Sequence, residues 1–321
     1  MLGLRKRRRD APPFNPADFP DRPITPPDED PAVAVLYQPY RAGPGLARVP
    51  LDALIWPLGR PERLAGAGTV ADLEPRDHLL VRVCKSAHLP MPGVRARLSA
   101  LAIEPRVVHG YHMEILRWTW RGWFRIFTHD RRLLASVPNG IYQPGAMTWV
   151  PEWRELDLTK TRHASLIASA KRDHEGHRLR HEIAEFARAE GLDVDLLGWA
   201  YRPLESKAEG LAPYRFSVVI ENSSEPGYFS EKLIDAFMCE TVPIYWGAPD
   251  ITEHFDPAGM VVCRSGDEIR AALRVLDASD YERIRPALLA NKERCIRELH
   301  ISYRRKAARR VFEEATGRPA P

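Results

Sequence analysis

The second half of the chain alternates between two apolar patterns. The segment "GHRLRHEIAEFARAEG" (176–191) has apolar residues at helical spacing and ends on a glycine, which is typical of a helix C-terminus. Short apolar runs bounded by turn residues predict strands on either side of it. These strands are "HASLIASAKR" (163–172), "VDLLGW" (194–199), "YRFSVVIENS" (214–223), "TVPIYWG" (241–247) and "GMVVCRS" (259–265).

Strands that alternate with helices predict a parallel sheet covered on both faces. Further helices are expected to begin at Ser230, which suits an N-cap before an apolar stretch, and at the capping box formed by Ser265 and Glu268. Ligands of such sheets bind beyond the carboxyl ends of the strands. The loops after "SVVIE" (217–221) and "IYWG" (244–247) are therefore where chemistry is expected.

The first half repeats this organisation less clearly. From "AVAVLYQP" (32–39) to about residue 150, short apolar runs predict buried strands of another α/β sheet, with helical pieces between them. The segment "PGAMTWVPEWRELDLTKTRH" (144–163) breaks the pattern and is predicted to connect two domains. The later apolar runs of the first half that predict buried strands are "HLLVRVCKS", "RARLSALAIEPRVV" and "WFRIFTHDRRLLASV".

Proline dominates the opening of the chain, and it disfavours helices and central strands. We predict a flexible arm over residues 1–45, an N-terminal α/β domain over 46–155 and a C-terminal α/β domain over 156–321. The basic cluster from Arg5 to Arg9 has two interpretations, a solvated tail or weak contact with anionic lipid head groups at a membrane surface.

Composition narrows the class of protein. The 321 residues are 44% hydrophobic and 28% charged, and the net charge of +4 is too small to predict nucleic acid as a partner. The four cysteines stand singly, which predicts neither disulfides nor a zinc site and favours the cytoplasm. No apolar run is long enough to span a bilayer, and no apolar region follows the basic start. The Arg- and Ala-rich composition suggests a bacterial protein.

The start of the predicted helix at Ser230 is the clearest candidate site. A helix N-terminus presents unpaired N–H groups that bind anions, so a bound diphosphate would explain Lys232 in the first turn. Glu231 would then reach for hydroxyl groups such as those of a ribose. The alternative is an exposed first turn with a solvated Lys232, at a cost of a few tenths of a kcal/mol, roughly.

Two neighbouring loops add polar and flexible positions. Glu221 and Asn222 end an apolar strand and can hydrogen-bond a ligand, although Asn222 with Ser223 also suits a simple Asx turn. After the next strand, Gly247 allows a ligand to approach the backbone closely. The preceding Tyr245 and Trp246 are expected in the core.

The stretch "YRFSVVIENSSEPGYFSEKLIDAFMCETVPIYWGAPDITEHF" (214–255) resembles the signature region of the α-1,3/1,4-fucosyltransferases, glycosyltransferase family ten. The family pattern is FENS, then Y-x-TEK, then P-x-x-x-G. Here Ile220 stands where phenylalanine is usual, and Ser230 replaces threonine. The likeness weakens upstream and becomes faint before about residue 160. It implies a GT-B fold, with two Rossmann-like domains facing a cleft, the acceptor on the N-terminal domain and GDP-fucose on the C-terminal one.

The resemblance also implies roles for single residues. It places Lys232 on the donor diphosphate, Glu231 on the ribose, and Asn222 and Tyr228 nearby, with Glu221 in the same motif. A basic residue of the preceding helix also contacts the phosphates in this family. Arg180 matches best. Arg178 is two residues away and stays an alternative, because the alignment of this helix with the family is not fixed to one register. Arg202 is a third candidate.

The family inverts configuration, which requires a carboxylate base in the N-terminal domain and positive charge at the leaving diphosphate. Glu104 ends an apolar strand before a proline and is our candidate, although an ordinary strand-end carboxylate explains it equally well. Glu114 and Asp130 are weaker alternatives, and His129 is expected to form hydrogen bonds rather than act in catalysis.

The resemblance predicts a fucosyltransferase that joins fucose to a glycan acceptor of a cell-surface or protein-linked kind, from the cytoplasmic side. No DxD metal motif lies in a suitable loop, since "DVD" (193–195) precedes a strand and is expected to be a turn, so no metal cofactor is predicted. Two alternatives stay open. One is a transferase of the same fold that uses another nucleotide sugar, and the other is a non-catalytic protein that binds nucleotides or carbohydrates.

Overall fold

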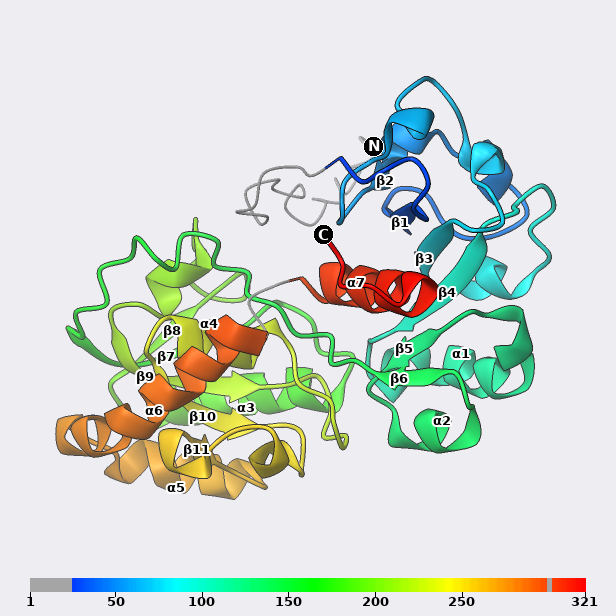
Figure 1. Cartoon of the computed structure of the whole chain (residues 1–321). Helices are drawn as coiled ribbons and strands as arrows, with labels where there is room; N and C mark the ends of the chain where they lie inside the picture. Colours follow the sequence, from blue (N-terminus) through cyan, green and yellow to red (C-terminus); the bar gives the residue numbers. More distant parts are fainter. Residues whose placement is uncertain (1–24, 299–301) are drawn as a thin grey trace, which may run out of the picture.

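Two α/β domains lie side by side in the computed structural model, which describes residues 25–298 and 302–321 (Figure 1). The predicted lipid contact of Arg5 to Arg9 lies outside the described residues. Each domain is built around its own mainly parallel sheet. The described helices include none that is both long and apolar enough to cross a membrane.

The N-terminal sheet has the strand order β2-β1-β3-β4-β5-β6. Every neighbouring pair is parallel except β1 with β2. The strands are β1 Val33–Leu36, β2 Leu54–Ile55, β3 His78–Arg82, β4 Arg97–Ala102, β5 Ile126–Thr128 and β6 Gly140–Tyr142.

Helices cover both faces of this sheet because its strands are apolar on both sides. On one face, β1 contributes Ala34 and Leu36 to a core shared with α1 and α2. On the other, Val33 and Val35 pack in a core with α7, which comes from the far end of the chain. The helices are α1 Arg106–Thr119, α2 Arg131–Ser136 and α7 Tyr303–Thr316.

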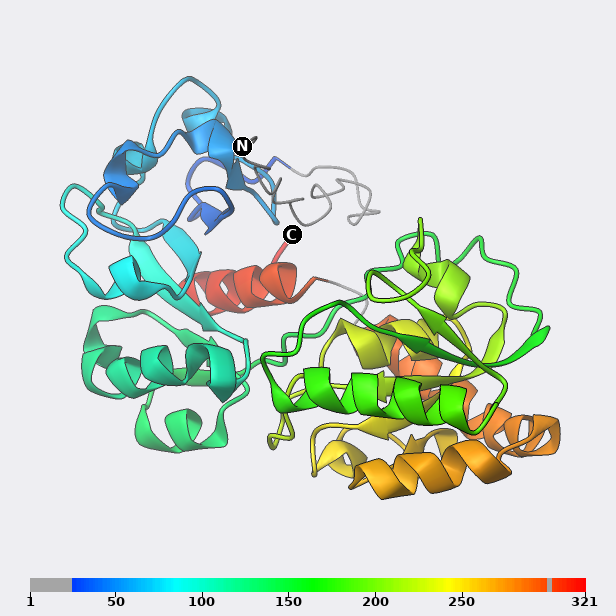
Figure 2. The ribbon, with the colours of Figure 1, turned by 180° about the vertical axis from the view of Figure 1, so that it is seen from behind.

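The C-terminal sheet is parallel throughout, with the order β11-β10-β9-β7-β8. Seen from behind, α3 and α5 run along one face, and α4 contacts α6 elsewhere on the domain (Figure 2). The elements are β7 Arg162–Ile167, α3 Glu175–Ala189, β8 Val194–Leu197, β9 Tyr214–Ile220, α4 Glu231–Met238, β10 Val242–Trp246, β11 Val261–Val262, α5 Gly266–Val275 and α6 Ala278–Glu298.

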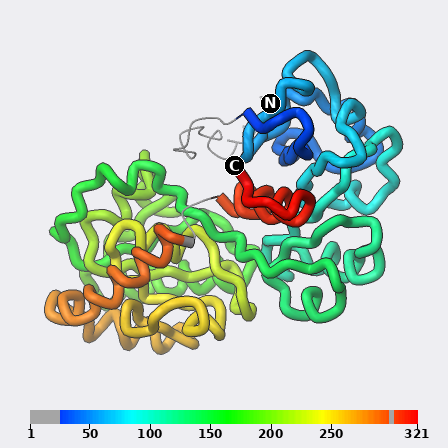
Figure 3. Tube along the Cα trace, in the orientation of Figure 1, coloured from blue at the N-terminus to red at the C-terminus, as the bar shows by residue number. Residues whose placement is uncertain are grey.

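The predicted strands and helices of this half are thus confirmed, but three sequence-based boundaries are wrong. The predicted arm over 1–45 ends too late, because residues 33–36 form a buried strand inside the sheet. The C-terminal domain does not extend to residue 321, because α7 packs on the N-terminal sheet while α6 stays on the C-terminal one (Figure 3). Asp195 of the expected turn lies in β8, where its carboxylate accepts a hydrogen bond from Tyr214.

Candidate functional site

The candidate site is built where β9 ends and α4 begins. Strand β9 is buried almost throughout, so the polar residues that follow it are brought to the carboxyl edge of the sheet. Ser230 caps α4 as predicted, with its hydroxyl accepting a hydrogen bond from the Lys232 amide. The turn that joins the two elements includes Gly227 at φ 73°, a left-handed conformation that favours glycine.

Glu221 is the anchor of this turn. Its side chain is fully buried, and its two carboxylate oxygens accept hydrogen bonds from the Ser230 amide at 2.8 Å and the Ser230 hydroxyl at 2.6 Å. The prediction that Glu221 binds a ligand is therefore wrong, because both oxygens are in use and no surface is left to contact one. Its role is to hold the start of α4 against the sheet.

Lys232 lies over the N-terminus of its own helix. Its ammonium group donates to the Ser230 hydroxyl at 2.9 Å and lies 3.2 Å from a Glu231 carboxylate oxygen and 3.5 Å from one of Glu221. A cation here opposes the helix dipole, and the two carboxylates offset that cost. About a quarter of the side chain (24%) remains exposed to solvent.

Glu231 sits between two lysines. Besides Lys232, the ammonium group of Lys207 lies 3.8 Å from its carboxylate. Burial by itself raises the pKa of Glu231, but the charges of Lys232 and Lys207 outweigh it and lower the pKa from 4.5 to about 2. Glu231 is therefore ionised at all ordinary pH values and can accept hydrogen bonds from hydroxyl groups.

Lys207 is fixed in turn by the fully buried Asp235, whose carboxylate it approaches to 2.6 Å. The other oxygen of Asp235 accepts from the Thr148 hydroxyl at 2.9 Å and the Trp149 amide at 2.7 Å. Both of these residues belong to the interdomain connection. Asp235 thus ties the connection and Lys207 to the helix that carries Glu231.

Asn222 and Arg180 meet beside this helix terminus. The Arg180 guanidinium is buried and donates to the Ile220 carbonyl at 2.9 Å and to the Asn222 side chain at 3.0 Å. Arg178 is exposed, and within the described part of the chain its guanidinium donates to the Asp173 carbonyl and not to a signature residue. Arg202 is exposed on the loop after β8, and its guanidinium forms no hydrogen bond within the described residues. Of the three candidates, the structure brings only Arg180 to the signature residues.

Tyr228 marks the boundary between the two domains. Its ring is buried against the His129 ring of the N-terminal domain, with centroids 5.1 Å apart. Burial raises the pKa of Tyr228 well above 10, and the charges of Glu221, Glu231 and Glu104 raise it further. The Tyr228 side chain therefore lies within the electrostatic reach of both the proposed base and the donor-side carboxylates.

Glu104 follows β4 at the carboxyl edge of the N-terminal sheet. It pairs with Arg82 at the end of the neighbouring strand, with 2.5 Å between nitrogen and oxygen, and its side chain remains 32% exposed. Tyr303 of α7 lies close, because the charges of Arg82 and Glu104 both act on its pKa, which burial raises. The Glu104 carboxylate is therefore partly exposed at this sheet edge, as a base must be.

The other candidate bases have structural roles. Asp130 caps α2 by accepting from the Leu133 amide at 2.6 Å, and it also pairs with Arg106. Glu114 pairs with Arg106 and Arg117 along α1. The expected hydrogen bonds of His129 are not formed, since its ring nitrogens are unpaired within the described residues and its Nε2 lies 3.6 Å from a carboxylate oxygen of Glu225.

Two members of the site were not predicted. Arg82 could have been found, because it ends the strand next to Glu104 and parallel strands end at the same sheet edge. Lys207 carries no such signal, since it begins a short 3-10 helix (Lys207–Gly210) between β8 and β9, and no local pattern there indicates that its side chain reaches Glu231. Within the described ranges, no group of three His, Cys, Asp or Glu side chains is placed to hold a metal ion.

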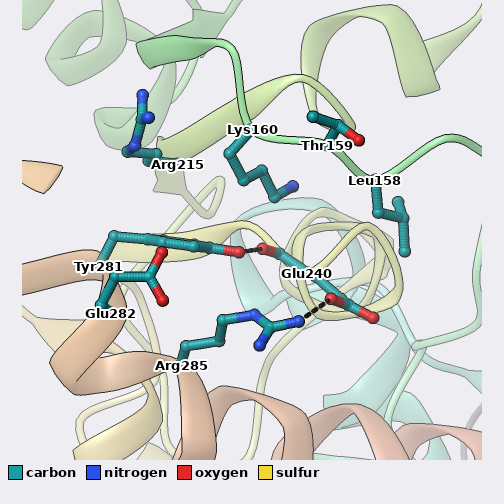
Figure 4. Close-up of a pocket in the computed structure, with 8 residues that line it drawn as sticks. All are labelled: Leu158, Thr159, Lys160, Arg215, Glu240, Tyr281, Glu282 and Arg285. Carbon is teal, nitrogen blue, oxygen red and sulfur yellow. Dashed lines mark hydrogen bonds and ion pairs between the residues drawn. The ribbon is translucent and has the colours of Figure 1, made fainter.

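A polar pocket of about 260 Å³ lies at the opposite edge of the C-terminal sheet (Figure 4). Its lysine, Lys160, precedes β7 and donates to the carbonyls of Ala212 and Cys239, both at 2.7 Å. Its Glu240 precedes β10 and pairs with Arg285 at 3.5 Å. These charged groups bind one another or the backbone, and the pocket lies at the amino ends of the strands, away from the signature loop.

Comparisons in sequence agree with the resemblance. No protein-family model matches the chain. The Helicobacter pylori alpha-(1,3)-fucosyltransferase FucT is 41% identical over 58 residues, which are 18% of this chain and 12% of that protein. A putative fucosyltransferase-like protein of Arabidopsis thaliana is 32% identical over 135 residues, 39% of this chain and 24% of that protein. The matches thus span less than a quarter of these relatives' length.

Comparisons of structure confirm the GT-B fold. An alpha,alpha-trehalose 6-phosphate synthase from Burkholderia multivorans has a TM-score of 0.50 at 9% identity and covers 76% of this chain and 73% of its own. A crystal structure of an alpha1,3-fucosyltransferase with GDP-fucose has a TM-score of 0.48 at 17% identity. This match covers 76% of this chain and 79% of the fucosyltransferase chain. At 9% identity the likeness to the synthase concerns the fold alone.

Proposed function

Because the chain is related in sequence to the α-1,3-fucosyltransferases, we propose that it is an inverting glycosyltransferase that moves fucose from GDP-fucose to a hydroxyl group of a glycan acceptor. The observation that carries the proposal is the arrangement of the signature residues. Asn222, Glu231 and Lys232 lie at one sheet edge, joined there by Arg180, and Tyr228 lies between them and the opposite domain.

The donor is held from the C-terminal domain. Lys232 and the N-terminus of α4 both attract the diphosphate, so the ammonium group would exchange part of its contact with Glu231 for phosphate oxygens. Glu231, freed from that contact, is ionised and accepts hydrogen bonds from the ribose hydroxyls. Arg180 supplies a second positive charge but keeps its hydrogen bond to the Ile220 carbonyl.

In the reaction, Glu104 accepts the proton of the acceptor hydroxyl as the oxygen attacks C1 of the fucose. The bond between C1 and the phosphate oxygen breaks on the opposite face, and GDP leaves with the electron pair. Lys232 and Arg180 neutralise the developing charge, so the proposed reaction needs no metal ion. Arg82 holds the Glu104 carboxylate at the carboxyl edge of the N-terminal sheet.

A thermal-shift panel of nucleotides tests donor recognition first. GDP is expected to stabilise the protein and UDP is not. Lys232→Ala should reduce the GDP shift, whereas Lys85→Ala, which removes an exposed lysine of the N-terminal domain, should leave it intact. Stabilisation by UDP would instead support a transferase of the same fold with another donor.

Transfer is tested with GDP-fucose and a panel of glycans by following GDP release and product mass. Glu104→Gln should bind GDP as the wild type does and lose transfer. Binding of GDP without transfer by the wild type to any glycan would favour a non-catalytic binding protein. No response to any nucleotide would refute the proposal.

A further inference from the structure

The first turn of α1 takes its cap from the other domain. Pro105 stands at the N-cap position of α1 and offers no side-chain hydrogen bond, whereas Asp130, Ser230 and Ser265 cap their own helices α2, α4 and α5. The unpaired amide at the start of α1 therefore needs an external acceptor. Glu225, from the signature loop of the C-terminal domain, supplies it.

Both oxygens of Glu225 approach the Arg106 amide, at 2.8 and 3.1 Å. One of them also accepts from the Ser223 hydroxyl at 2.8 Å, which fixes the orientation of the carboxylate. The remaining neighbour is His129, whose Nε2 lies 3.6 Å away. Burial by itself raises the pKa of Glu225, but the nearby His129 ring and the hydrogen bonds from the Arg106 amide and Ser223 outweigh it and lower the pKa. A carboxylate at a helix N-terminus also matches the sign of the helix dipole.

The same loop is bound to the N-terminal domain on its other side. The Tyr142 hydroxyl, at the end of β6, donates to the Gly227 carbonyl at 3.1 Å. The Gly227 amide donates to Asp250, which in turn pairs with Arg131 of α2. The loop from Glu225 to Gly227 is thus held between the ends of β5 and β6 and the start of α1.

We propose that Glu225 is a positioning residue that couples the donor-binding loop to the base. Glu104 lies two residues before the capped amide, and Lys232 lies seven residues after Glu225, so one carboxylate joins the two segments that must align. The inference rests on the proposed function, in which the distance between base and donor decides the rate. A misplacement of about 1 Å costs roughly 100-fold in rate.

The experiment compares Glu225→Ala and Glu225→Gln with Glu253→Gln. Glu253 also bridges the domains, through Arg131, but it is 60% exposed and lies outside the loop, so it controls for the loss of one interdomain charge. Each variant is assayed for GDP affinity, for kcat and KM with GDP-fucose, and for hydrogen exchange of the first turn of α1.

Glu225→Ala is expected to exchange its α1 amides faster and to lose kcat by about 10- to 100-fold, with GDP affinity nearly unchanged. Glu225→Gln, which keeps an acceptor oxygen but loses the charge, should fall between it and the wild type, and Glu253→Gln should match the wild type. Unchanged kcat in Glu225→Ala, or unchanged exchange at α1, would overturn the inference. Absence of transfer by the wild type would refute the proposed function instead, and the exchange measurement would still decide whether Glu225 caps α1.

Discussion

Gly176, in the first turn of α3, offers a sharp test of how the donor site is built. Its amide donates to the Asn222 carbonyl at 3.1 Å, so α3 lies directly against the loop after β9. A Cβ atom at this position would lie 1.7 Å from the Glu221 carbonyl oxygen, a distance that no real contact allows. Helix propensity alone predicts that Gly176→Ala stabilises the protein by about 1 kcal/mol. The close packing at this position predicts instead that Gly176→Ala destabilises the protein.

The magnitude follows from the geometry. To reach even 3.0 Å from that oxygen, the new methyl group must retreat by at least 1.3 Å, and α3 must move with it. Overpacking of this kind costs about 1–3 kcal/mol in unfolding free energy. The same movement carries Arg180, one turn further along α3, away from Asn222. We therefore expect a weaker GDP-induced shift as well as a lower melting temperature.

The measurement is thermal unfolding of Gly176→Ala with and without GDP. A fall of about 2–4 °C for each kcal/mol is typical of domains of roughly this size. Gly66→Ala is the matched control, because a Cβ at Gly66 meets no atom within 4 Å. If Gly176→Ala melts at or above the wild-type temperature and keeps the full GDP shift, the close approach of α3 to the signature loop is refuted.

Three further predictions concern the charges of the site. Lys232→Ala should weaken GDP binding in calorimetry by about 10- to 100-fold, the range of a charge-assisted hydrogen bond, and a smaller loss would remove Lys232 from the diphosphate. The fall in the pKa of Glu231 from 4.5 to about 2 corresponds to about 3 kcal/mol of stability, present above pH 4.5 and lost as pH falls through 2. Wild-type stability in urea should therefore decline more between pH 5 and pH 2 than that of Glu231→Gln, and parallel curves would contradict this. Lys207→Met leaves Asp235 buried without its cation and should lower the free energy of unfolding by about 3–5 kcal/mol. If the loss comes from the broken pair, the double variant Lys207→Met with Asp235→Leu should recover part of that stability.

The elements around the signature could be predicted because their causes are local. Apolar spacing decided β9 and α4, and the hydroxyl of Ser230 bonds the amide two residues later. The position of Lys232 at the N-terminus of α4 followed from the same short-range geometry. These features depend on residues within one or two turns of each other, so the amino-acid order is sufficient to reveal them.

The choice between Arg178 and Arg180 needed the tertiary structure. A helix has 3.6 residues per turn, so side chains two positions apart point in directions that differ by about 200°. The packed face of α3 therefore decides which arginine reaches Asn222. Packing also decided that Glu221 is buried and that α7 covers the N-terminal sheet.

The sequence by itself determined the alternation of strands and helices, the cap of α4 and the family signature, because periodicity and capping act between near neighbours. Only the tertiary structure decided that Glu225 caps α1, that Lys207 lies beside Glu231, and that Arg82 holds Glu104. Each of these pairs joins residues that lie far apart in the chain or on separate strands. Their partners are chosen by how the sheets and helices pack, which no local pattern records.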